Sequence, residues 1–122
     1  MEPEKVFRSQ MAALLANDID AVVAHFTPDC RLFDMARPMH PFVGREGLRT
    51  FLVAYFKAWR VAGLTITNLV SQGSRLAAEI ELSLEARDGS GSRLIRSSLF
   101  DDIEGGLIAR ERAYRDPAGR KE

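Results

Sequence analysis

The stretch LTITNLVSQGSRLAAEIELSLEA, residues 64–86, marks the point at which the apolar residues change their spacing from a period of about 3.6 to a period of 2. Beyond Gly63 every apolar segment alternates in this way, which is typical of half-buried strands. The turns between these segments carry the glycines that tight antiparallel connections need. Four strands are therefore predicted, at Leu64–Val70, Leu76–Ala86, Arg93–Asp101 and Leu107–Arg115.

Before Gly63 the spacing is helical, apart from one short strand and one loop. Asp18 is placed to cap the second helix, because its side-chain oxygen can accept a free backbone amide, and Pro28 ends that segment. The predicted helices are Glu4–Asn17, Ile19–Phe26 and Leu48–Trp59; the strand is Cys30–Met35 and the loop Ala36–Gly44. Helices followed by an antiparallel meander predict an α+β fold in which three N-terminal helices pack against one curved sheet.

Length and composition are those of a single globular domain, with a folded unit of about residues 5–116 within 1–122. The chain has 17 basic and 17 acidic residues, so no net field draws it to nucleic acid or to an anionic membrane, and we expect neither partner. Cys30 is the only cysteine, and with His25 and His40 alone it cannot form a zinc site; we expect it to be a small core or loop residue. The N-terminal residues lack an apolar signal region, which favours a cytoplasmic protein.

Several segments occur in an order that resembles a known family. They are an N-D-I-D step at residues 17–20, T-P-D-C-R-L-F-D at 27–34, F-V-G-R-E-G-L at 42–48 and G-L-I-A-R-E-R-A-Y-R-D at 106–116. Together they resemble the SnoaL-like members of the nuclear transport factor 2 superfamily. The resemblance implies a cone-shaped half-barrel around a deep pocket for a hydrophobic small molecule, and a homodimer formed through the outer face of the sheet. Many activities share this shell, so the fold alone does not define the function.

The resemblance to ketosteroid isomerase places a carboxylate, Asp34, on the short strand where that enzyme moves a proton next to a carbonyl. A carboxylate facing an apolar cone is desolvated, which raises its pKa and makes it a better base. The two groups that hold the oxyanion in that isomerase fall here on Gln10 and on Ser97 or Ser98. True steroid isomerisation is therefore disfavoured.

The other relatives imply polar groups that this chain lacks. Limonene epoxide hydrolase uses an Asp-Arg-Asp set, whose places are taken here by Ile80, Leu82 and Ala113. The polyketide cyclases place their acid on the last strand, again at the position of Ala113. Epoxide hydrolysis is therefore disfavoured, and these three residues are expected to make an apolar pocket wall.

Further candidates lie near the expected pocket. His40, in the loop at its mouth, could exchange protons with a ligand or with Asp34. Tyr55 and Trp59 share a face of the third helix with Phe51 and could stack on a flat ligand, although core packing explains them equally well.

Glu111 has two open interpretations. It could turn into the cone between Ala109 and Ala113, or it could be an ordinary exposed charge paired with Arg110 or Arg112, which is the commoner arrangement. Residues of the opposite face of this strand, and Glu79 and Glu81, are expected on the solvated or dimer-forming surface.

Two functional hypotheses follow. The first is an isomerase, cyclase or dehydratase that needs no cofactor, in which Asp34 moves a proton on a hydrophobic carbonyl compound with help from His40, Tyr55 or Glu111. The second is a dimeric binding or accessory domain that uses the same pocket without chemistry. An enclosed cavity containing Asp34 would favour the first hypothesis.

Overall fold

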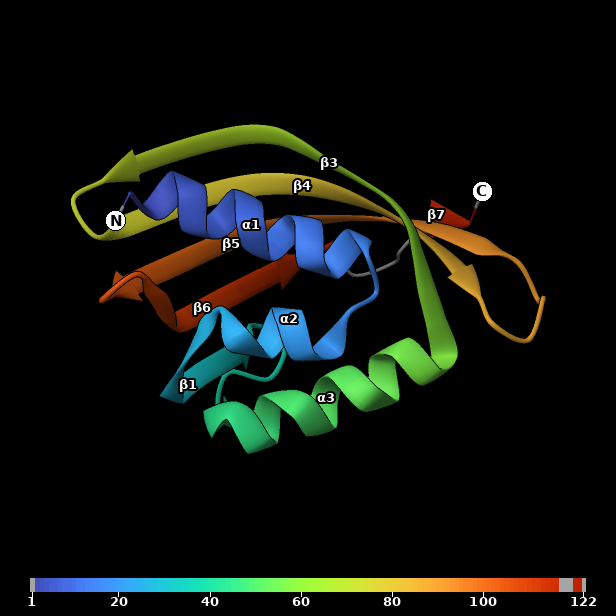
Figure 1. Ribbon diagram of the computed structural model, residues 1–122. Helices are drawn as coiled ribbons and strands as arrows, with labels where there is room; N and C mark the ends of the chain where they lie inside the picture. Colours follow the sequence, from blue (N-terminus) through green and yellow to red (C-terminus); the bar gives the residue numbers. More distant parts are fainter. Residues whose placement is uncertain (1, 117–119, 122) are drawn as a thin grey trace.

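The computed structural model describes residues 2–116 and 120–121, and these form three helices and a seven-stranded sheet (Figure 1). The helices are α1 (Pro3–Leu15), α2 (Ile19–Ala24) and α3 (Gly44–Ala58). The strands are β1 (Phe26–Asp34), β2 (Phe42–Val43), β3 (Trp59–Gln72), β4 (Arg75–Ala86), β5 (Ser92–Glu104), β6 (Leu107–Arg115) and β7 (Arg120–Lys121).

The strands form a single curved sheet in the order β2-β1-β6-β5-β4-β3, with β7 paired to β5. The expected α+β cone is confirmed: the sheet bends around the three helices without closing into a barrel (Figure 1). One detail differs from the antiparallel expectation, because β1 runs parallel to β6. These two strands are far apart in the sequence, so no hairpin imposes an antiparallel pairing.

The core lies between the concave face of the sheet and the helices. Helix α1 contributes Phe7 and Met11, and α3 contributes a stripe that includes Leu52; all three are buried. Ile80 and Leu99 meet them from β4 and β5. None of the helices in the described part of the chain is long and apolar enough to cross a membrane.

Bulges give the sheet its curvature. The pairing of β3 with β4 shifts register between Val61 and Gly63 and again between Ile66 and Asn68. The pairing of β5 with β6 shifts at Asp102–Ile103, where Ala109 is the extra residue. An extra residue bends a strand and increases its twist, so these strands arch over the helices.

Several predicted helix boundaries differ from the structure, and two of them, at the ends of the second and third helices, place a residue in a strand instead. The second helix ends at Ala24, and Phe26 already belongs to β1, which includes Pro28. The third helix ends at Ala58: Trp59 has extended backbone angles and pairs with Ala86 as the first residue of β3. The helical spacing of Tyr55 and Trp59 therefore does not reflect a shared helix face.

Candidate ligand-binding site

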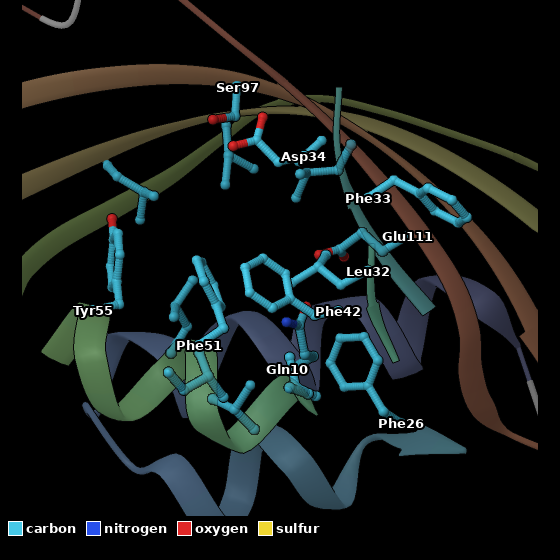
Figure 2. Close-up of a pocket in the computed structure, with 18 of the residues that line it drawn as sticks. Gln10, Phe26, Leu32, Phe33, Asp34, Phe42, Phe51, Tyr55, Ser97 and Glu111 are labelled. Carbon is cyan, nitrogen blue, oxygen red and sulfur yellow. The ribbon is translucent and has the colours of Figure 1, made fainter. Parts of the chain in front are cut away.

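A cavity of about 110 Å³ lies between the concave face of the sheet and the helices (Figure 2). This volume is below the 300–1,000 Å³ of pockets for drug-sized ligands and close to the roughly 150 Å³ of a cavity that accepts benzene. Most of its wall is aliphatic or aromatic. The polar side chains that line it are Gln10, Asp34, Tyr55, Ser97, Glu111 and Arg115.

The first group of polar residues, which we call the open end, contains Asp34, Tyr55, Ser97 and Arg115. Arg115 Nη2 donates to Asp34 Oδ2 at 2.7 Å, and the backbone amide of Ala36 donates to Asp34 Oδ1 at 3.0 Å. The side chains of Asp34 and Arg115 keep 30% and 40% of their surface exposed, so solvent reaches this end. Asp34 thus lines the cavity as predicted, but it has an arginine partner that was not anticipated.

Tyr55 and Ser97 complete the open end. Figure 2 shows Ser97 next to Asp34, with the Tyr55 side chain extending from α3 toward the same region. Burial raises the pKa of Tyr55, and the nearby charge of Arg115 opposes this shift only in part. The phenol is therefore protonated at neutral pH and available as a hydrogen-bond donor.

The second group, which we call the deep end, contains Gln10, Asp101 and Glu111. Asp101 and Glu111 are directly opposite each other on β5 and β6 and are 1% and 6% exposed. Glu111 lines the cavity, and Gln10 on α1 lies beside it with only 4% exposure (Figure 2). The exposed-charge interpretation of Glu111 is therefore wrong, and its side chain points into the cone.

The two deep-end carboxyls hold a proton between them. Burial, and then the charge of Glu111, raise the pKa of Asp101 well above its usual value. Burial also raises the pKa of Glu111, while a hydrogen bond between the two side chains raises the pKa of Asp101 and lowers that of Glu111. If both were ionised, neither could donate, and Asp101 Oδ1 and Oδ2 and Glu111 Oε1 would have no partner. Asp101 is therefore the member that keeps the proton.

The remaining predicted site residues divide into two groups. Phe51, Ile80, Leu82 and Ala113 line the cavity, and the last three form the apolar wall that was expected of them. His40 is exposed in the turn before β2 and does not line the cavity. Trp59 also lies outside the cavity lining, and its ring packs under the Arg93 guanidinium, 5.1 Å from the ring centroid.

Asp101 and Arg115 were not singled out from the sequence. A signal existed for both: Ser97, Leu99 and Asp101 alternate on one face of β5, and Ala113 and Arg115 do so on β6. A strand register was needed to tell which face of each strand points inward.

The arrangement suits proton transfer and hydrogen bonding. Within residues 2–116 and 120–121 there is no group of three His, Cys, Asp or Glu side chains that could hold a metal ion. Cys30 is buried in the core as expected, and burial raises the pKa of its thiol.

Comparison with known proteins gives a family and several structural neighbours. The SnoaL-like domain family matches residues 7–111. No curated protein sequence matches the chain.

The chain is structurally similar to three solved proteins at 15–18% identity. One is called a candidate isomerase, from Bacillus subtilis (15% identity; TM-score 0.85; 96% of this chain and 91% of that one). Another is an LEH-like epoxide hydrolase from M. tuberculosis (18%; 0.78; 93% and 81%). The third is a Catenulispora acidiphila protein with a ketosteroid isomerase-like fold in complex with trimethylamine (17%; 0.78; 89% and 83%).

Proposed function

Because the chain belongs to the SnoaL-like domain family, we propose that it binds a small hydrophobic carbonyl compound in the cavity and moves a proton on it, without a cofactor. The observation that carries this proposal is the open end, where Asp34, Arg115, Tyr55 and Ser97 meet at one side of a mostly apolar cavity. The trimethylamine complex of the Catenulispora acidiphila protein supports a ligand of small size.

Three of the open-end residues have a role in this reaction. Asp34 takes a proton from the carbon next to the carbonyl group; each of its oxygens has one partner, which leaves lone pairs for the substrate. Arg115 and Tyr55 donate hydrogen bonds to the enolate oxygen that forms, and the apolar walls strengthen these bonds by excluding water. If the substrate has a carbon–carbon double bond conjugated with the enolate, returning the proton to the far end of that conjugated system completes an isomerisation.

The second candidate function is ligand binding without chemistry. It is favoured by the ion pair itself, because Arg115 and the Ala36 amide satisfy Asp34 in the absence of any substrate. The apolar residues Ile80, Leu82 and Ala113 also favour ligand binding without chemistry, since they offer no second catalytic group.

Proton exchange separates the two candidates. The wild-type protein is incubated in D₂O with acetone, cyclopentanone and cyclohexanone, and NMR follows deuterium incorporation next to the carbonyl group. Catalysis predicts exchange above the buffer rate that falls about 100-fold in Asp34→Asn, while ketone affinity stays within about threefold. The matched control is Asp20→Asn, which removes an exposed carboxylate that is likewise paired with an arginine, Arg49, at 2.6 Å.

Two results would decide against catalysis by Asp34. Ketones that bind but show no exchange above buffer would establish the binding function instead. Exchange that is equal in wild type and Asp34→Asn would exclude Asp34 as the base.

A further inference from the structure

The deep end of the cavity contains buried hydrogen-bond acceptors. Gln10 Oε1 is buried and has no partner, and the Glu111 carboxyl, whose hydrogen bond is to Asp101, has further lone pairs; both residues line the cavity. In Figure 2 the Gln10 amide and the Glu111 carboxyl lie close together at the same part of the cavity. A buried acceptor without a donor costs about 1–3 kcal/mol, so this end is suited to a ligand that brings donors.

The deep end also lacks a counter-charge. In the described part of the chain, the ion pairs involve neither Asp101 nor Glu111. Once one member of the pair is ionised, its negative charge lies in an apolar surrounding, where an uncompensated charge is costly. At the open end, by contrast, Asp34 and Arg115 neutralise each other.

The walls next to the deep end are aromatic. Phe26 and Phe42 line the cavity, and Figure 2 places both rings near Gln10 and Glu111. The Phe42 ring also packs against Phe51, with centroids 4.7 Å apart. Aromatic faces attract cations, by about 0.5–2 kcal/mol per contact, so these walls suit a positive group as well as an apolar one.

We propose that the deep end binds the ammonium group of a small aliphatic amine, with Glu111 as its counter-ion and Gln10 as a second acceptor. The alkyl part of the amine fills the apolar cavity, whose volume of about 110 Å³ admits only a few carbon atoms. This inference rests on the cavity being the ligand site proposed above, but it does not depend on proton transfer by Asp34.

Binding of the cation is coupled to the protons of the carboxyl pair. An ammonium group stabilises the ionised pair, so protons are released when the amine binds, and affinity falls as lower pH adds a second proton to the pair. The other groups that influence the pair are the Asp102 carboxylate beside Asp101, the Cys30 thiol on β1, and Gln10 on α1. None of these supplies a positive charge.

The test compares tert-butylamine, which is an ammonium ion at neutral pH, with tert-butanol, which has nearly the same shape and no charge. NMR titration and calorimetry in two buffers measure affinity and proton release. We expect the amine to bind at least tenfold more tightly than the alcohol and to release protons. In Glu111→Gln, amine affinity should fall about tenfold or more, while alcohol affinity stays within about twofold.

The control is Glu85→Gln, which removes a half-exposed carboxylate that is paired with Arg60 at 2.7 Å, and it should leave both affinities unchanged. Asp101→Asn is a second variant that removes the proton donor of the pair. Equal binding of amine and alcohol, binding of neither, or an unchanged amine affinity in Glu111→Gln would overturn the inference. The ketone exchange experiment has a separate readout, so either proposal can fail alone.

Discussion

Asp101 and Glu111 are the two acidic residues of the described chain that are buried and have no basic partner in an ion pair. Both occupy inward-facing positions of their strands. The neighbouring inward-facing positions carry Leu99, Ile103 and Ala113, which are apolar. Replacing a buried carboxyl by a neutral side chain of the same shape removes the cost of keeping it from water. A costly buried pair, one member of which lines a cavity, is expected where a binding site, rather than packing, determines the residue type.

The pair makes stability depend on pH. Both carboxyls have raised pKa values in the folded protein. The protein is therefore most stable with respect to these groups below their pKa in the unfolded chain, near pH 4, and it loses this stability as pH rises through their pKa values in the folded protein. Glu111→Gln should therefore raise the unfolding free energy at pH 8 by about 1–2 kcal/mol and flatten its decrease between pH 4 and 8. Urea denaturation at several pH values measures this.

Glu85→Gln is the control for this measurement, because Glu85 is half exposed and paired with Arg60 at 2.7 Å. Its pH profile should follow that of the wild type. A Glu111→Gln profile that also runs parallel to wild type would show that the pair is not protonated in the native state.

The two alanine neighbours of Glu111 made an inward position one of two interpretations, with the exposed one favoured, and gave no indication of its partner. Without the bulge, Asp101 would face Arg110; the extra residue Ala109 shifts the register so that Asp101 faces Glu111. A shift of one residue reverses which side chains point inward, and sequence periodicity does not locate a single bulge. Asp34 lines the cavity, whereas its contact with Arg115 depends on the parallel pairing of β1 with β6, which places Asp34 opposite Ala113.

At the scale of elements, the α1–α2 corner is joined to the sheet by one side chain. Asn17 has a positive φ of 57°, which asparagine tolerates better than most residues. Its side chain accepts from the Val61 amide at 2.8 Å and donates to the Val61 carbonyl at 3.0 Å. These bonds fix the two helices that form one cavity wall against the bulged part of β3.

Loss of this contact should loosen the helices. Asn17→Ala should lower the unfolding free energy by about 1–3 kcal/mol, because it leaves two partly buried backbone groups of Val61 unpaired. Asn17→Asp, which keeps an acceptor but not the donor, should lie between Ala and wild type. Chemical denaturation measures the order, and Asn68→Ala, which removes only an exposed 3.4 Å contact with Glu79, is the control. If Asn17→Ala, Asn17→Asp and Asn68→Ala were equally stable, the proposed role of Asn17 would be contradicted.

The helices and strands themselves were largely predictable, whereas the junctions between them were not. The Asp18 cap was predicted and is present, with the Ala21 amide donating to its carboxyl at 3.1 Å. Trp59 was assigned to α3 because it lies four residues after Tyr55 in the sequence. Pairing with Ala86 on β4 overrides this local pattern, and such a long-range contact leaves no trace in helical spacing.

At the scale of the whole molecule, the concave face of the sheet is covered by helices, whereas the convex face carries exposed apolar residues. Phe100 and Tyr114 lie on it with 45% and 46% of their surface exposed and with ring centroids 5.8 Å apart. Val70 on β3 is 61% exposed, and the pairings of Val70 with Ala77 and of Ala77 with Phe100 place it in the same row across the sheet. Exposed aromatic patches of this kind are typical of protein interfaces.

We propose that two copies pack through this face, so that their cavities open on opposite sides of the dimer. Light scattering should then give twice the mass of one chain. Phe100→Glu and Tyr114→Glu should each weaken the dimer about tenfold or more, because a charge would be buried at the centre of the contact. Val53→Glu on α3, where the valine is 50% exposed on the opposite side of the molecule, is the control and should leave the mass unchanged.

A wild-type mass of one chain at high concentration, or a Phe100→Glu variant that remains fully dimeric, would refute this assembly. Because the cavity faces the other side of the sheet, amine and ketone binding should persist in the monomeric variants.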